Sequence, residues 1–167
     1  MKNKLKLFAV ITVSIFAVYN IVWAIYVSIL YQSFTSKMNG LKQLKTDEYT
    51  YYVKKPNYLS FVGNLSISEN VDFAGEEKVC SGSLIIWPKL RGKCSVAVNI
   101  SVTQIDYSKL TRNTEVYGIM LNEKRTPDFT VPGVYEIYME NKELFDNMEL
   151  IDSLYDAADD MWDVFAD

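Results

Sequence analysis

The stretch Cys94-Ser-Val-Ala-Val-Asn-Ile-Ser-Val-Thr103 decides the fold class of this chain, because apolar and polar residues alternate along it. Side chains of an extended strand point to opposite faces in turn, so a period of two is typical of a β-strand with one buried face. Antiparallel sheets commonly present their other face to water. One face here carries Cys94, Val96, Val98, Ile100 and Val102, and the other carries Ser95, Asn99, Ser101 and Thr103.

Further strand candidates lie on both sides of this stretch. The longer ones are Tyr58–Ile67 and Val79–Trp87, and the shorter ones are Tyr49–Val53, Glu115–Leu121 and Val134–Met139. Pro88, Gly92, Pro127 and the Pro132-Gly133 pair mark the connections between them. Six short strands without βαβ alternation predict an antiparallel sheet that is curved or closed into a small barrel.

The two cysteines, Cys80 and Cys94, fall on the apolar face of their strands. In a domain outside the cytoplasm, an even pair is most simply explained by one disulfide. We therefore expect a Cys80–Cys94 bridge, with two buried thiols as the alternative if the topology is reversed.

The chain ends in a segment of different character, residues 141–167. Apolar residues recur there at spacings of three and four, which predicts one amphipathic helix packed on the sheet. Residues 140–167 hold ten acidic residues and one lysine, a net charge of −9, whereas the whole chain has −4. The acidic residues Asp152, Asp156, Asp159, Asp160 and Asp163 are therefore candidates for docking a basic partner surface.

The N-terminal region, Leu7 to Tyr31, contains no charged residue. As a helix it would be about 37 Å long at ~1.5 Å per residue, enough to cross a membrane core of ~30 Å. The run is longer than the apolar region of a secretory signal peptide and lacks a small-residue cleavage site, which favours an uncleaved anchor. The fold class expected is thus α+β: a transmembrane helix, a small antiparallel sheet, and an acidic helix.

Orientation follows from the basic residues that flank this run. Lys2, Lys4 and Lys6 precede it, which favours a cytoplasmic N-terminus, although three lysines also follow it within residues 32–46. The expected organisation is a cytoplasmic tail at 1–6, an anchor at 7–31, a stalk at 32–46, and an extracytoplasmic domain at 47–167. The membrane would be a bacterial inner membrane or a plasma membrane, with the domain periplasmic or extracellular.

The predicted span has one face of small or weakly polar residues. Such residues let helices approach closely in lipid, and a buried asparagine amide seeks a partner. This face predicts a contact with another transmembrane helix, the alternative being chance alignment beside an aromatic belt. Its residues are Ser14, Ala17, Asn20, Ala24 and Ser28.

Several chemistries are excluded or disfavoured by composition. The chain has no histidine, so histidine-dependent nucleophiles and histidine-ligated metals are excluded. The acidic segment lacks the spacing of a calcium loop, and no Gly-rich nucleotide motif is present. A sequence pI near 4.9 disfavours nucleic acid. We expect no catalytic residues, no metal and no cofactor.

Two functional hypotheses remain. In the first, the protein is an accessory subunit that binds and stabilises or modulates a larger membrane protein through its span and domain. That layout is similar to that of small companion proteins of membrane-bound transcriptional regulators. In the second, the sheet encloses an apolar cavity that binds a small hydrophobic ligand at the membrane surface. Tyrosines could line it: Tyr49, Tyr51, Tyr52, Tyr58, Tyr117, Tyr135 and Tyr138.

Overall fold

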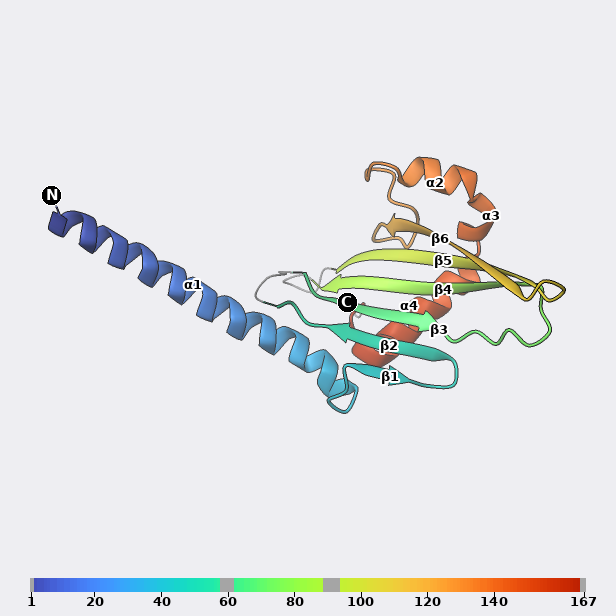
Figure 1. Ribbon diagram of the computed structural model, residues 1–167, viewed down its shortest axis with the longest axis horizontal. Coiled ribbons are helices and arrows are strands. Elements are labelled where there is room, and N and C mark those ends of the chain that lie inside the picture. The colour runs from blue at the N-terminus through green and yellow to red at the C-terminus, as the bar shows by residue number, and fades with distance from the viewer. Residues whose placement is uncertain (1, 58–61, 89–93, 166–167) are drawn as a thin grey trace.

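The computed structural model describes residues 2–57, 62–88 and 94–165, and within them a long N-terminal helix precedes a sheet and three shorter helices (Figure 1). The N-terminal helix is α1 (Lys2–Lys37). The strands are β1 (Gln43–Lys45), β2 (Tyr49–Lys54), β3 (Asn64–Glu69), β4 (Lys78–Pro88), β5 (Cys94–Asp106) and β6 (Thr111–Leu121). The C-terminal helices are α2 (Val134–Glu140), α3 (Lys142–Phe145) and α4 (Met148–Trp162).

The sheet is an antiparallel meander in which each strand pairs with its neighbour in sequence, in the order β1-β2-β3-β4-β5-β6. The expected α+β class is therefore confirmed. Of the two forms predicted for the sheet, the open one is found, with β1 and β6 at the edges. The longest pairings are β4 with β5, from Lys78↔Gln104 to Pro88↔Cys94, and β5 with β6, from Val96↔Leu121 to Asp106↔Thr111, each with eleven residue pairs.

Most predicted strands are present, with shifted ends. The strand predicted at Tyr58–Ile67 is β3, which begins at Asn64; positions 58–61 lie outside the described residues. The segment predicted as a stalk contains β1, which sequence alone did not identify.

The strand predicted at Val134–Met139 is wrong, because these residues form α2. Val134 is buried, and Ile137 and Tyr138 are half-buried, which is the i, i+3, i+4 spacing of a helix. Gly133, at φ 85°, adopts the left-handed conformation that starts the helix after Pro132. The β-branched and aromatic residues fit a strand locally, but packing against the sheet overrides that preference.

The acidic C-terminal segment is two helices rather than one. The helical conformation is interrupted between Phe145, where α3 ends, and Met148, where α4 begins. The Asn147 side chain caps α4 by accepting the Leu150 N–H at 3.2 Å. The predicted packing is confirmed, since α4 lies on β3 and β4 and buries Ile151, Tyr155 and Trp162. Phe165 is half-buried.

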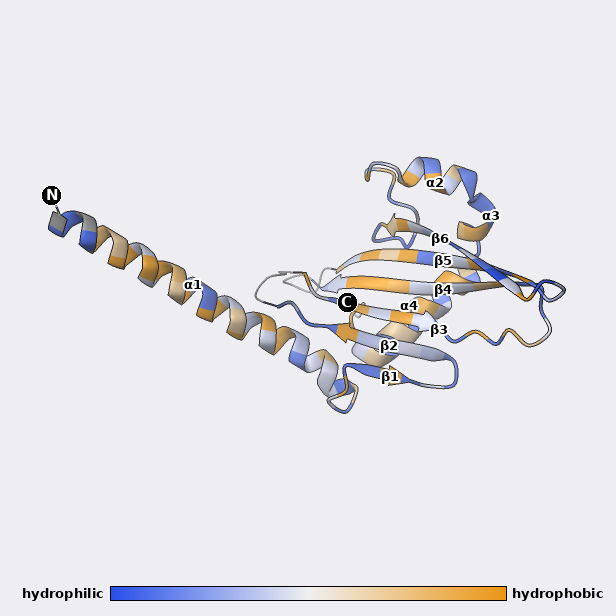
Figure 2. Cartoon of the chain, viewed as in Figure 1, coloured by the Kyte–Doolittle hydropathy of each residue, from blue (hydrophilic) through white to orange (hydrophobic). Residues whose placement is uncertain are grey.

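The core lies between α4 and one face of the sheet. It contains the apolar residues of each strand, which Figure 2 shows as orange bands along β4 and β5. Fully burying a Leu or Ile side chain stabilises by about 1.5–3 kcal/mol, so this face cannot stay open to water. The sheet residues that are at most 1% exposed are Val53, Leu65, Ile67, Leu84, Ile86, Val98 and Ile100.

The predicted Cys80–Cys94 disulfide is wrong. The two cysteines are not bonded to each other; Cys80 is exposed and Cys94 is half-buried. In the β4–β5 register Cys80 pairs with Val102, whereas Cys94 pairs with Pro88. Eight residues of strand separate the two levels, about 27 Å at ~3.4 Å per residue, whereas a disulfide needs Cα atoms within ~7 Å.

We expect both thiols to remain reduced in the purified full-length protein. Cys80 should react quickly with a maleimide and Cys94 more slowly, because Cys94 is half-buried. Mass spectrometry of labelled protein, with and without prior reduction, measures this. Labelling that appears only after reduction would contradict the register.

A second expectation concerns Gly82, on the face of β4 beneath α4. A Cβ placed there would lie 2.7 Å from Leu154 Cδ1 and 3.0 Å from Leu150 Cδ1. Gly82→Val should therefore lower the free energy of unfolding by about 1–3 kcal/mol, as overpacking does. Ser83→Val, on the opposite face, is the matched control. Urea unfolding of the full chain in mild detergent compares the two variants, and equal stabilities would contradict the close approach of α4.

Candidate functional site

The most informative region is the junction between α1 and the domain. One stripe of α1 packs against the core, and its members are Val27, Leu30, Tyr31, Phe34 and Met38. Met38 is fully buried and Tyr31 is 4% exposed. The helix that carries the apolar run therefore continues into the folded domain without a break.

Polar contacts at the junction join the first element of the chain to the last. Lys37 Nζ donates to the Trp162 carbonyl oxygen at 2.8 Å and lies 3.9 Å from the Asp163 carboxylate. The last carbonyls of a helix lack partners within it and carry partial negative charge, so a lysine there is favourable. The end of α1 and the end of α4 hold each other in place.

The turn after α1 explains why the helix ends where it does. Asn39 and Gly40 have φ of 58° and 80°, the left-handed values that close a helix. The Gly40 N–H donates to the Thr35 carbonyl oxygen at 2.8 Å. The chain then turns directly into β1, so residues 32–46 form part of the domain.

The predicted helix-contact face lies on the exposed part of α1. Ser14, Ala17, Ala24 and Ser28 are exposed, and Asn20 is half-buried. The Asn20 amide donates to the Phe16 carbonyl oxygen at 2.7 Å, so its own helix satisfies part of its hydrogen-bonding capacity. α1 is long and apolar enough to cross a membrane, from Lys6 to Lys37.

The acidic residues of α4 have partners within the chain. Arg125 lies 3.2 Å from Asp152 and 3.8 Å from Asp156, and its guanidinium stacks 4.5 Å above the Tyr155 ring. Sequence analysis did not identify Arg125, which lies in a turn at φ 60° far from α4 in sequence. The first half of the acidic face is thus neutralised locally.

The remaining predicted docking residues lie near the end of α4. Asp159 accepts the Phe165 N–H at 2.8 Å, and Asp163 lies opposite Lys37. Asp160 is exposed. Four of the five acidic residues predicted to dock a partner thus have contacts within the chain: two with Arg125, one with Lys37 and one with the Phe165 N–H.

Tyr155 lies at the centre of the α4 contacts. It is 3% exposed, and its ring centroid is 4.6 Å from that of Phe165. Burial raises the pKa of Tyr155 to about 12, although the Arg125 guanidinium opposes this rise. The phenol therefore stays neutral under Arg125 at physiological pH.

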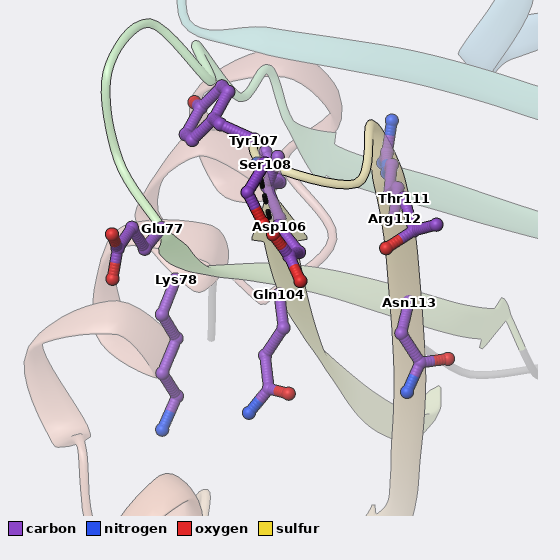
Figure 3. Close-up of a pocket in the computed structure, with 10 residues that line it drawn as sticks. Glu77, Lys78, Gln104, Asp106, Tyr107, Ser108, Thr111, Arg112 and Asn113 are labelled. Carbon is purple, nitrogen blue, oxygen red and sulfur yellow. Dashed lines mark hydrogen bonds between the residues drawn. The ribbon is translucent and has the colours of Figure 1, made fainter.

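Two surface hollows in the described part of the chain are open to solvent and lined mainly by polar residues. The larger, about 640 Å³, lies at the tip of the β5–β6 hairpin, where Lys78, Gln104 and Asn113 extend from three strands (Figure 3). Tyr107 Oη donates to the Phe73 and Glu76 carbonyl oxygens there. A smaller hollow of about 330 Å³ lies on the serine-rich face of the sheet.

Of the tyrosines predicted to line an apolar cavity, those that the structure describes do not surround a common space, although the Tyr49 and Tyr51 rings lie 6.2 Å apart; Tyr58 lies outside the described residues. Tyr51 packs in the core with its ring centroid 5.6 Å from that of Trp162, whereas Tyr52 and Tyr135 are exposed. Tyr117 donates to Glu115 and Tyr138 to Asp146 at the surface. Large side chains such as Trp162, Phe145 and Met38 fill the described interior. This arrangement gives the hydrophobic-ligand hypothesis no support.

We expect Arg125→Gln to lower the free energy of unfolding by about 1 kcal/mol, from the partly exposed ion pairs (~0.2–1 kcal/mol) and the cation–π contact (~0.5–1 kcal/mol). Arg125→Lys should recover the charge but not the planar stacking. Lys124→Gln, at the exposed neighbouring position, should leave stability unchanged. Equal effects at 124 and 125 in urea unfolding would show that the Arg125 contacts contribute nothing.

Comparison of this chain with protein-family models, with curated proteins and with solved structures finds no match. What the chain does is therefore inferred from its own residues and geometry.

Proposed function

We propose that the chain is a single-span membrane protein whose domain binds a larger membrane protein and stabilises or modulates it. In this proposal the N-terminus is cytoplasmic, and the domain is periplasmic or extracellular. The domain acts by contact rather than by catalysis. The partner is a membrane protein such as a sensor or regulator, reached laterally within the same membrane.

The observation that carries the proposal is the continuous packing from Val27 to Met38. A domain on a flexible linker can search the volume around its anchor, and its orientation is free. Here the helix itself enters the core, so the domain has one orientation relative to the span. That arrangement suits recognition of a neighbour whose own position is fixed by the membrane.

The direction of the small-residue face supports lateral binding. At 100° per residue, the centre of this face lies roughly 90° around α1 from the stripe that packs on the domain. A partner helix could therefore lie along Ala17, Ala24 and Ser28 without meeting the domain. Small residues allow the close approach that drives helix association in lipid.

Photo-crosslinking in native membranes tests this proposal. A crosslinkable residue at Ala17 should give a discrete adduct with one membrane protein, whereas the same residue at Phe16 should not. Ala24→Leu and Asn20→Leu should weaken recovery of that partner by blocking close approach, by about 1–2 kcal/mol of association. Phe16→Leu is the matched control.

The accessory role also predicts how the cellular level of the same partner changes. If the protein stabilises its partner, the steady-state level of the partner falls when the chain is removed, and Ala24→Leu reproduces that fall. Adducts from both faces, or an unchanged partner level, would refute the accessory role while leaving the membrane anchor intact.

A further inference from the structure

The position of the membrane surface follows from which residues of α1 the domain covers. The apolar residues from Leu7 to Tyr26 are exposed apart from the half-buried Trp23, whereas Val27 and the later members of the stripe pack on the domain. The segment from 7 to 26 is about 30 Å long at ~1.5 Å per residue, the thickness of a hydrocarbon core. With α1 across a bilayer, the domain therefore begins at the level of the lipid headgroups.

The meander places its connections alternately at two ends of the sheet. The near end, beside α1, contains the end of β2, the start of β3, the end of β4 and the start of β5. Lys55 Nζ donates to Gln32 Oε1 at 2.5 Å, which ties the near end to α1 just beyond the apolar run. The far end contains the β1–β2, β3–β4 and β5–β6 connections.

Charge differs sharply between these ends. At the far end the connections carry Asp47, Glu48, Asp72, Glu76 and Glu77 against Lys109. The strand ends there add Glu69 and Asp106 and the basic residues Lys45, Lys78 and Arg112, so the far end remains net acidic. At the near end Lys54 is the last residue of β2 and Lys55 follows it.

Most other charged groups at the near end contact a partner within the chain or are balanced, whereas Asp160 is exposed. Asp163 lies opposite Lys37, and Asp159 accepts the Phe165 N–H. The β6–α2 connection carries two acidic and two basic residues. Lys42, Lys54 and Lys55 are the described basic residues beside the end of β2, and Lys55 is the one that contacts α1.

We propose that the near end of the domain, through Lys54 and Lys55, binds the anionic headgroups of the membrane that α1 spans. The inference rests on the membrane anchor of the proposed function. Basic residues held at an anionic lipid surface each contribute a factor of about 5 in affinity, so the pair contributes roughly 25-fold. The acidic far end points away from the same surface. Attraction of the near end and repulsion of the far end therefore favour the same orientation of the domain on the membrane.

The experiment uses the full chain reconstituted in nanodiscs of phosphatidylcholine alone or with phosphatidylglycerol. Hydrogen exchange of peptides covering residues 51–57 should be about tenfold slower in discs with phosphatidylglycerol, and 0.5 M salt should remove the difference. Peptides covering 106–112, at the far end, should exchange equally in both. The double variant Lys54→Glu/Lys55→Glu should abolish the slowing, and Lys54→Gln/Lys55→Gln should reduce it.

The control variant Lys78→Glu/Lys109→Glu changes the same charge at the far end and should keep the slowing. Equal exchange in both discs, or slowing that survives Lys54→Glu/Lys55→Glu, overturns the lipid contact alone, provided that the chain stays in the disc. Release of the chain from discs by alkaline carbonate overturns the anchor, and with it the proposed function. Unchanged exchange at 106–112 in the near-end variants shows that they are folded.

Discussion

The structure depends on covering the one apolar face of an open antiparallel sheet. Leu65, Ile67, Leu84 and Ile86 are fully buried on that face, and α4 lies across β3 and β4. The opposite face is rich in serine and threonine and needs no cover. α4 must therefore be apolar inward, and its outward acidic residues require neutralisation. Arg125 and Lys37 meet that requirement at the two ends of the helix.

Much of the sheet could be predicted because its signal is local. The alternation from Cys94 to Thr103 specifies a strand whatever surrounds it, and β5 is found there. The cysteine pairing could not be predicted the same way. The alternation along one strand shows which residues share a face of the sheet. Which residues of two strands lie opposite each other is decided by the β4–β5 register, and this register places Cys80 and Cys94 at opposite ends of the strand pair. The strand prediction for residues 134–139 was wrong for a related reason. These residues form a helix that packs on β6, and that packing surface exists only in the folded sheet.

The junction was partly visible in the sequence. The helical spacing of Leu30, Phe34 and Met38 indicates that the helix continues past the apolar run. The domain core that covers this stripe is formed by residues far away in sequence. Residues 32–46 taken alone are therefore predicted as a stalk. The contact of Arg125 with Asp152, 27 residues apart, was equally invisible because turn residues carry no periodic pattern. In contrast, the small-residue face of α1 is a pure sequence feature, and the helix geometry adds its direction relative to the domain.

The contact between Lys37 and Trp162, 125 residues apart, has a consequence for synthesis. Because α1 is synthesised before the sheet and α4 after it, the apolar strands are made before their cover exists. Contacts of such long sequence separation close late and slow folding. The apolar face of the sheet thus stays uncovered until α4 has been synthesised. A chain in this state exposes apolar surface and unpaired strand edges, which makes it prone to aggregation and a substrate for chaperones.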